Sequence, residues 1–170
     1  MTTRGEALVA CLMEIERHVG SSGWDQPARL FALVPTAALL EAEPSLAAHL
    51  GQPTSLGALS SVEQDGFAAG DDPVAALARI SWPDAVHGCA IALERTFLPA
   101  DAEGDLTDDP DQNARIVATH PRRQDVRVVV GCTRDGQRHG VGRLQSNPDD
   151  LLGGQDLVPG LTSALARTLE

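Results

Sequence analysis

The stretch QDVRVVVGCTRDGQRHGVGRL, residues 124–144, decides the fold of this chain. Its first half carries an apolar side chain at every second position, at Val126, Val128, Val130 and Cys132, which is the pattern of a strand that buries one face. Asp135-Gly136 follows, a dipeptide that favours a two-residue type I′ turn because both turn positions need a positive φ. The sequence therefore predicts an antiparallel hairpin in which Cys132 lies opposite His139.

Three glycines share one face of this predicted hairpin. Gly131, Gly140 and Gly142 lie there on the side away from Cys132. A sheet face without side chains lets another backbone or a ligand approach closely. Both a tightly packed helix and a bound ligand are consistent with this pattern.

Segments upstream of the hairpin show alternating helix and strand patterns. Apolar residues recur at helical spacing over residues 8–19 and predict a first helix. Further segments, with strand patterns or helix-start signals, predict a short buried strand at 30–34, an edge strand around 56–62, a helix beginning at Asp72-Pro73 and a long central strand at 86–98.

The segments around the hairpin complete the chain. Residues 101–111 contain six acids and no base, which predicts an acidic solvated loop over 99–111. We expect a helix from about 111 to 119 before the hairpin, a loop over 147–154 after it, and an amphipathic helix over 157–169 at the end.

These elements predict an α+β fold, in which N-terminal, middle and C-terminal helices pack on a mainly antiparallel sheet. No repeat or linker divides the sequence, so we expect a single domain over residues 1–170. The order of elements resembles that of type III secretion chaperones and related chaperone-like domains. That resemblance concerns the fold and is a weak argument for function.

Composition excludes several classes of function. The chain has 170 residues, a net charge of −11, no Lys and no Tyr, which removes Schiff-base catalysis and lysine-containing phosphate loops. Its few aromatic residues and its negative charge argue against a nucleic-acid partner. No apolar run is long enough to span a membrane, and three unpatterned cysteines without a signal peptide favour the cytoplasm.

Charge is distributed unevenly along the chain. Residues 112–146 contain seven arginines and two aspartates, a local charge of +5, so the rest of the chain carries −16. Arginine clusters bind carboxylates and phosphates through paired hydrogen bonds. The candidate binding residues for an anionic ligand or partner are Arg122, Arg123, Arg127, Arg138 and Arg143. The same arginines could instead neutralise the chain's own acids or meet the acidic loop of a second subunit.

Cysteine and histidine offer a second candidate site. If the fold gathers them, His87, Cys89, Cys132 and His139 could form a small-molecule or catalytic centre. None of their spacings is a zinc signature, and no oxyanion-stabilising group or orienting carboxylate can be named for a Cys-His pair. We therefore assign no metal, no cofactor and no catalytic residue.

Four runs of sequence carry a family resemblance: GWDQPARLFALVPT (23–36), WPDAVHGCAIALER (82–95), HPRRQDVRVVVGCTRDGQRH (120–139) and LVPGL (157–161). Together they resemble an uncharacterised actinobacterial family of unknown function and of similar length. The resemblance implies a cytoplasmic protein with no known activity or ligand, and it transfers no functional residue.

Two hypotheses follow from the sequence. The first is a non-enzymatic binding or chaperone-like interaction domain, a homo-oligomer (a dimer) or bound to another protein, that uses an apolar face and the arginine-rich hairpin. The alternative is a small-molecule-binding protein or enzyme with the Cys/His site described above.

Overall fold

The computed structural model describes residues 4–46, 58–67, 72–97, 104, 106–121, 123–154 and 158–170. Its centre is an antiparallel sheet in the order β2-β1-β3-β4-β5-β6. The strands are β1 (Arg29–Pro35), β2 (Leu59–Glu63), β3 (Gly88–Phe97), β4 (Gln124–Thr133), β5 (Arg138–Leu144) and β6 (Asn147–Gly154). The predicted α+β class is confirmed, and the predicted strands at 30–34, 56–62 and 86–98 appear as β1, β2 and β3.

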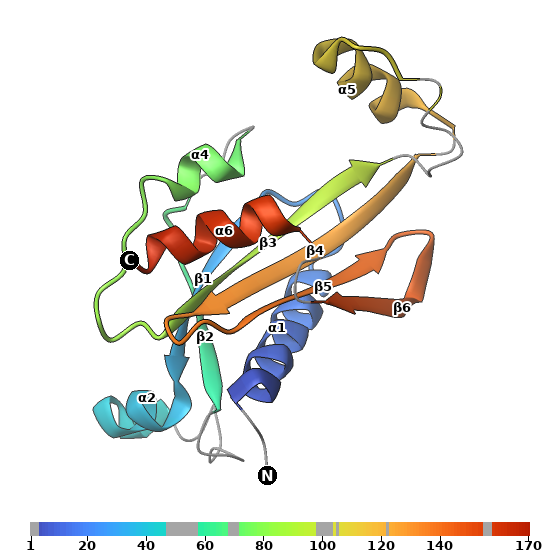
Figure 1. Ribbon diagram of the computed structural model, residues 1–170. Coiled ribbons are helices and arrows are strands. Elements are labelled where there is room, and N and C mark those ends of the chain that lie inside the picture. Colours follow the sequence, from blue (N-terminus) through green and yellow to red (C-terminus); the bar gives the residue numbers. More distant parts are fainter. Residues whose placement is uncertain are drawn as a thin grey trace.

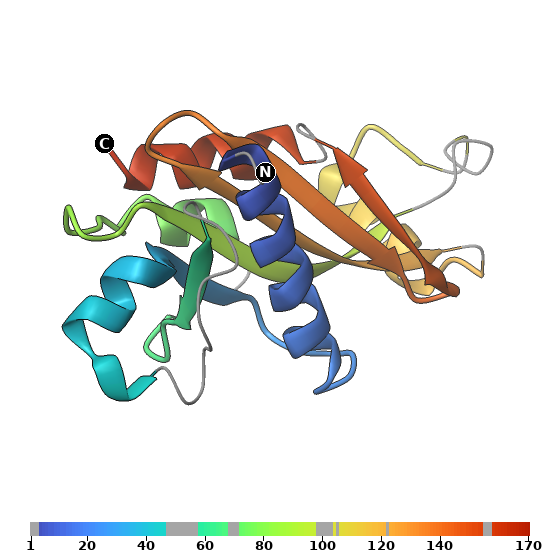
Figure 2. The same ribbon diagram turned by 90° about the horizontal axis from the view of Figure 1, so that it is seen from below.

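Helix α1 (Arg4–Gly20) covers one face of the sheet (Figure 2). The predicted apolar stripe is the buried one: Leu8, Cys11, Leu12, Ile15 and Val19 are buried against residues of β1, β3, β4 and β5. Gly131 lies under this helix, where an added Cβ would come 2.7 Å from Leu12 Cδ2 and 3.1 Å from the Cys89 carbonyl oxygen. Of the two explanations for this glycine, helix packing is therefore the one that holds.

Helices α4 (Pro73–Leu77) and α6 (Pro159–Thr168) cover the opposite face (Figure 1). Leu161 and Leu165 of α6 pack with Leu77 of α4 over the apolar residues of β3 and β4. The predicted start of α4 is confirmed, because the Asp72 side chain accepts a hydrogen bond from Ala75 N at 3.1 Å. No helix in the described ranges is long and apolar enough to cross a membrane.

Three further elements lie at the periphery. They are α2 (Thr36–Ala42), the 3₁₀ turn η1 (Pro44–Leu46) and α5 (Pro110–Thr119). Because α5 begins at Pro110, the predicted acidic loop ends earlier than expected, and its residues 99–103 and 105 lie outside the described residues. Asp108 and Asp109 are exposed as expected, and Asp109 caps α5 by accepting from Asp111 N at 3.0 Å.

The loop predicted over 147–154 is wrong, because this segment forms β6 and pairs with β5. Two aspartates, two glycines and Pro148 remove the alternation that marks a strand in sequence. An outer strand pairs on one side only, so it tolerates a proline that cannot donate to the ladder.

The hairpin exists, but its turn is one residue longer than predicted. Thr133 N donates to Gln137 O at 3.0 Å, which leaves residues 134–136 as the loop. Gly136 has φ +89°, whereas Asp135 does not have a positive φ, so a type I′ turn is not formed. The Thr133 hydroxyl donates to the Asp135 carboxylate and accepts from Gln137 N at 3.1 Å, which favours the longer loop.

This extra residue moves every side chain of β5 to the other face relative to the prediction. Cys132 pairs with Arg138, and His139 pairs with Gly131. The predicted pairing of Cys132 with His139 is therefore wrong, and the two residues lie on opposite faces of the sheet. Gly140 and Gly142 likewise pair with Val130 and Val128 on the α6 side, so the three glycines do not share a face.

Candidate functional site

The longer turn brings two of the predicted arginines together. Arg127 of β4 and Arg143 of β5 are direct cross-strand partners on the face that α1 covers. Two like charges in this position destabilise a sheet unless an opposite charge lies between them. Glu16 of α1 supplies that charge, and we call these three residues the Glu16 cluster.

The geometry of the Glu16 cluster is that of a buried ion network. Glu16 Oε1 lies 2.5 Å from Arg143 Nε and 3.4 Å from Arg127 Nη1. The side chains of Glu16 and Arg127 are 3% and 4% exposed, whereas that of Arg143 is 27% exposed. Glu16 is almost fully buried, and its two cationic partners offset the cost of removing the carboxylate from water.

Arg127 also fixes the chain that follows α1. Its guanidinium carbon lies 4.4 Å from the centre of the Trp24 ring, and Nη2 donates to Gly23 O at 3.1 Å. Gly20, the last residue of α1, lies so close to the Arg127 guanidinium that a Cβ added to it would come 2.8 Å from Arg127 Nη1. A cation at this position is favourable because the carbonyl end of a helix carries partial negative charge.

Glu94 holds the same loop from the neighbouring strand. It lies opposite Arg127 in the β3–β4 register, and its carboxylate accepts from Asp25 N at 2.9 Å and Gln26 N at 2.8 Å. Asp25 adopts a left-handed conformation with φ 66°, which aspartate tolerates better than most residues. The loop that carries Trp24 is therefore held from two strands.

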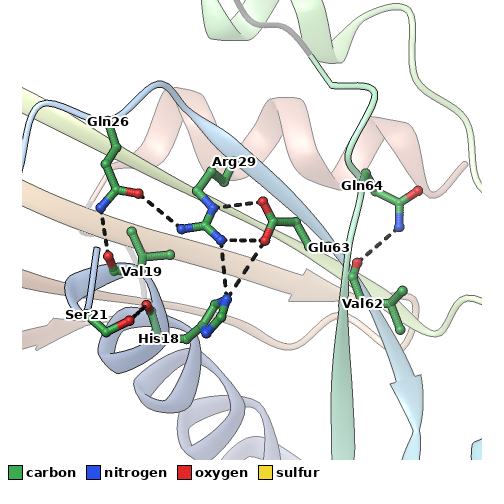
Figure 3. Close-up of polar contacts among 8 residues, drawn as sticks. All are labelled: His18, Val19, Ser21, Gln26, Arg29, Val62, Glu63 and Gln64. Carbon is green, nitrogen blue, oxygen red and sulfur yellow. Dashed lines mark hydrogen bonds and ion pairs between the residues drawn. The ribbon is translucent and has the colours of Figure 1, made fainter. Parts of the chain in front are cut away.

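Figure 3 shows a second ion network at the end of α1. Arg29 of β1 donates two hydrogen bonds to Glu63 of β2, from Nε to Oε2 at 2.8 Å and from Nη2 to Oε1 at 2.5 Å. His18 Nε2 of α1 lies 3.9 Å from the same carboxylate. The hydrogen bonds from Arg29 lower the pKa of Glu63 below its ordinary value. This network joins the sheet edge to the helix.

The two cysteines of the predicted Cys/His site do meet. Cys89 and Cys132 are direct partners in the β3–β4 register, and both are buried beneath α6. The Cys89 sulfur lies 3.4 Å from Thr168 Oγ1, which accepts from Trp82 Nε1 at 2.9 Å. The Thr168 hydroxyl donates to Leu165 O, and the Cys89 thiol donates to the same carbonyl oxygen at 3.6 Å. The hydrogen bond to Cys89, together with burial, raises the pKa of the Cys132 thiol.

The two histidines do not join these thiols. His87 Nε2 lies 3.8 Å from Asp135 Oδ1 in the hairpin turn, and no hydrogen bond links it to either cysteine within the described ranges. His139 lies on the opposite face, where burial lowers its pKa. Among the residues that the structure describes, no group of three or more His, Cys, Asp or Glu side chains is placed to hold a metal ion.

The side chain of Arg138, the first residue of β5, is exposed at the turn end of the hairpin. It borders a hollow of about 380 Å³ lined by Cys132, Thr133, Arg134, Gly136, Arg138, Ala166, Leu169 and Glu170. Arg134 is committed to the fold, since its guanidinium donates to the carbonyl oxygens of Trp82, Pro83, Val86 and Leu169. The Arg138 side chain is exposed and makes no hydrogen bond or ion pair with another described residue.

The five arginines predicted to bind a ligand or partner therefore lie in different environments. Arg122 lies outside the described residues, and Arg123 is exposed with Nη1 donating to His120 O at 3.2 Å. The prediction missed Glu16, although its spacing was informative: it lies four residues after Leu12 and three before Val19, inside the apolar stripe of α1. A carboxylate in a buried stripe indicates a buried cationic partner.

Comparison with known protein families gives a match that covers most of the chain. The family model described as "PPA1309-like protein" matches residues 8–170, which include the Glu16 cluster, the hairpin and α6. Neither the curated proteins nor the solved structures contain a match, so the similarity to secretion chaperones stays an analogy of element order. The family resemblance seen in the sequence is confirmed, and the chain belongs to the PPA1309-like protein family.

Proposed function

We propose that this chain is a non-enzymatic interaction domain that binds an acidic partner at the open end of the β4–β5 hairpin. The observation that carries the proposal is Arg138, an exposed arginine that borders a hollow and pairs with no described carboxylate. Arg127 and Arg143 are already paired with Glu16, so they are not available to bind a carboxylate of a partner.

The surroundings of Arg138 suit a carboxylate. A guanidinium binds a carboxylate through two parallel hydrogen bonds, which gives geometric as well as electrostatic preference. The neighbouring Arg134 adds a second positive charge, and its Nη1 donates to the carbonyl oxygen of Leu169, which lines the hollow. The net charge of −11 opposes an acidic partner at long range, where physiological salt screens charge beyond about 8 Å. Glu170 also lines the hollow and opposes such a partner locally, so Arg138 and Arg134 must outweigh it.

A titration of the full chain tests the proposal. The probe is a blocked peptide of six glutamates, with a peptide of six glutamines as the neutral control, followed by NMR at physiological salt. We expect the acidic peptide to shift the backbone signals of Thr133, Gly136 and Arg138, and the glutamine peptide to shift none of them.

Two matched variants separate this site from general attraction to arginine. Arg138→Gln should weaken binding of the acidic peptide by about tenfold, as expected for loss of one charge-assisted contact. Arg123→Gln removes another exposed arginine, away from the hollow at Arg138, and should change binding little. Equal loss in both variants, or no binding to the wild-type chain, would overturn the proposal.

A further inference from the structure

Cys89 and Cys132 form a pair of free thiols that the proposed function does not use. They are direct cross-strand partners on β3 and β4, the two middle strands of the sheet, and α6 lies over both strands (Figure 1). The Cα atoms of such partners are about 4.5–5.5 Å apart, a separation that a disulfide can span. The strand register therefore places the two sulfurs so that they can be joined without a change in strand pairing.

The two thiols of this pair differ in their surroundings. A hydrogen bond from Cys132 lowers the pKa of Cys89, and Thr168, Trp82 and the charge of Arg134 act in the same direction, while burial opposes them. The same hydrogen bond raises the pKa of Cys132. Cys89 is therefore the thiol that loses its proton first, with a protonated thiol beside it. This is the arrangement that disulfide formation needs, because the thiolate is the nucleophile.

The end of α6 separates the thiol pair from the hollow described above. Cys132 lines that hollow, and so does Leu169, the residue that follows α6. The Cys89 sulfur lies 3.4 Å from Oγ1 of Thr168, the last residue of α6. Because Cys89 and Cys132 are 0% and 1% exposed, an oxidant reaches them only after this end of α6 lifts. Such a local opening leaves the sheet folded.

We propose that Cys89 and Cys132 are a redox-active dithiol, which hydrogen peroxide converts into a cross-strand disulfide when the end of α6 lifts. The Cys89 thiolate attacks one peroxide oxygen, the O–O bond breaks, and the departing hydroxide takes up the proton that Cys89 released, which leaves a sulfenic acid. The Cys132 sulfur then attacks the Cys89 sulfur, and the S–O bond breaks. The hydroxyl group leaves with the Cys132 proton as a second water. Two electrons pass from the two sulfurs to the peroxide.

Oxidation changes how the end of α6 is held. The reduced Cys89 thiol donates to Leu165 O, and the disulfide has no proton to donate. The Cβ atoms of strand partners are about 4.5–5.5 Å apart, slightly more than a relaxed disulfide prefers, so the bond is easily reduced. The pair is therefore suited to a reversible change that loosens one wall of the hollow.

Peroxide oxidation of the full chain tests the pair. The reduced chain is treated with hydrogen peroxide in native buffer, the remaining thiols are alkylated, and disulfide-linked peptides are identified by mass spectrometry. We expect one linkage, between Cys89 and Cys132, which dithiothreitol reverses. With urea added below the unfolding transition, the logarithm of the oxidation rate should rise less steeply than global unfolding predicts, because only the end of α6 opens.

Two variants give the controls. Cys11→Ala removes the buried thiol on the opposite face of the sheet and should leave the linkage unchanged. Cys132→Ala should abolish the linkage, and the sulfenic acid on Cys89 should then persist and react with dimedone. No linkage in the native wild type overturns the proposal, and so does a linkage to Cys11 or an oxidation rate that follows global unfolding. None of these results depends on whether the hollow binds an acidic partner.

Discussion

Glu16 of α1 and Arg127 of β4 lie 3.4 Å apart in the interior, between atoms Oε1 and Nη1. They join the first helix to the central part of the sheet across 111 positions of sequence. Arg143 binds the same carboxylate from β5, so one buried anion is shared by two cations. The cluster therefore specifies where α1 ends on the sheet.

Glu16→Gln is expected to destabilise the chain by about 3–5 kcal/mol, because removal of one partner leaves buried charge without compensation. Urea denaturation followed by circular dichroism measures the change. Glu14→Gln, two residues earlier and exposed, should change the free energy of unfolding by less than about 0.5 kcal/mol. Equal effects of the two substitutions would contradict the role assigned to Glu16.

The Glu16 cluster gives a second prediction, which concerns why Glu16→Gln lowers the stability of the chain. Replacing Glu16, Arg127 and Arg143 together by Met removes all three charges and keeps apolar packing. Buried ion networks replaced in this way are often neutral or more stable. We expect the triple variant to be more stable than Glu16→Gln alone, with urea midpoints as the measurement. A triple variant less stable than the single one would show that the ion network, together with the contacts of Arg127 to Gly23 and Trp24, provides net stability.

Gly131→Ala should destabilise the chain by about 1–3 kcal/mol, because its Cβ would overlap Leu12 and crowd a backbone carbonyl. Combining it with Leu12→Ala tests the contact in a double-mutant cycle, and the two losses should be clearly less than additive. Gly154→Ala, at a strand glycine with open space around it, is the matched control. Full additivity would mean that Leu12 is not what the added methyl group meets.

The sequence predicted the helices and most strands because their apolar periodicity is strong. The stripe of α1, the Asp72-Pro73 start of α4 and the central position of β3 are read directly from local patterns. β6 was missed because an edge strand with Pro148 and two aspartates has no such pattern. Local propensity does not reveal pairing that one neighbouring strand imposes.

The Glu16 cluster was harder to predict, since the pairing of Arg127 with Arg143 depends on one extra residue in the hairpin turn. Asp135-Gly136 favours a two-residue loop, and only the hydrogen bonds of Thr133 to Asp135 and Gln137 select the longer one. That single position separates His139 from Cys132 and places Arg143 beside Arg127. The charge excess of the hairpin was visible in sequence, but the carboxylate that pairs with Arg127 and Arg143 lies 127 positions from Arg143.

The Arg29–Glu63 pair gives a pH dependence with a defined sign. Arg29 holds the pKa of Glu63 below its ordinary value, so the ionised form stabilises the fold at neutral pH. This contribution is lost as the pH falls through the lowered pKa. Glu63→Gln should therefore cost up to about 1 kcal/mol at pH 7, a small value because the carboxylate is partly exposed. The difference from the wild type should shrink toward zero below about pH 4.

Stability curves between pH 3 and pH 8 measure this effect, with Glu41→Gln at an exposed position of α2 as the control. The control should run parallel to the wild type over the whole range. A constant offset for Glu63→Gln at all pH values would mean that the substitution acts through packing and not through the charge of the carboxylate.

The three cysteines are expected to be unreactive in the folded chain. Cys11, Cys89 and Cys132 are at most 2% exposed, and burial raises the pKa of Cys11 to about 12. A thiolate must be reached by the reagent in order to react, and all three sulfurs are buried. Labelling by an aromatic disulfide reagent at pH 8 should therefore require opening of the structure. Urea should accelerate the labelling of all three thiols, and Cys132→Ser should remove one of them without speeding the others. Rapid native labelling of Cys132, abolished by Cys132→Ser, would instead favour a small-molecule site beneath the hollow at Arg138.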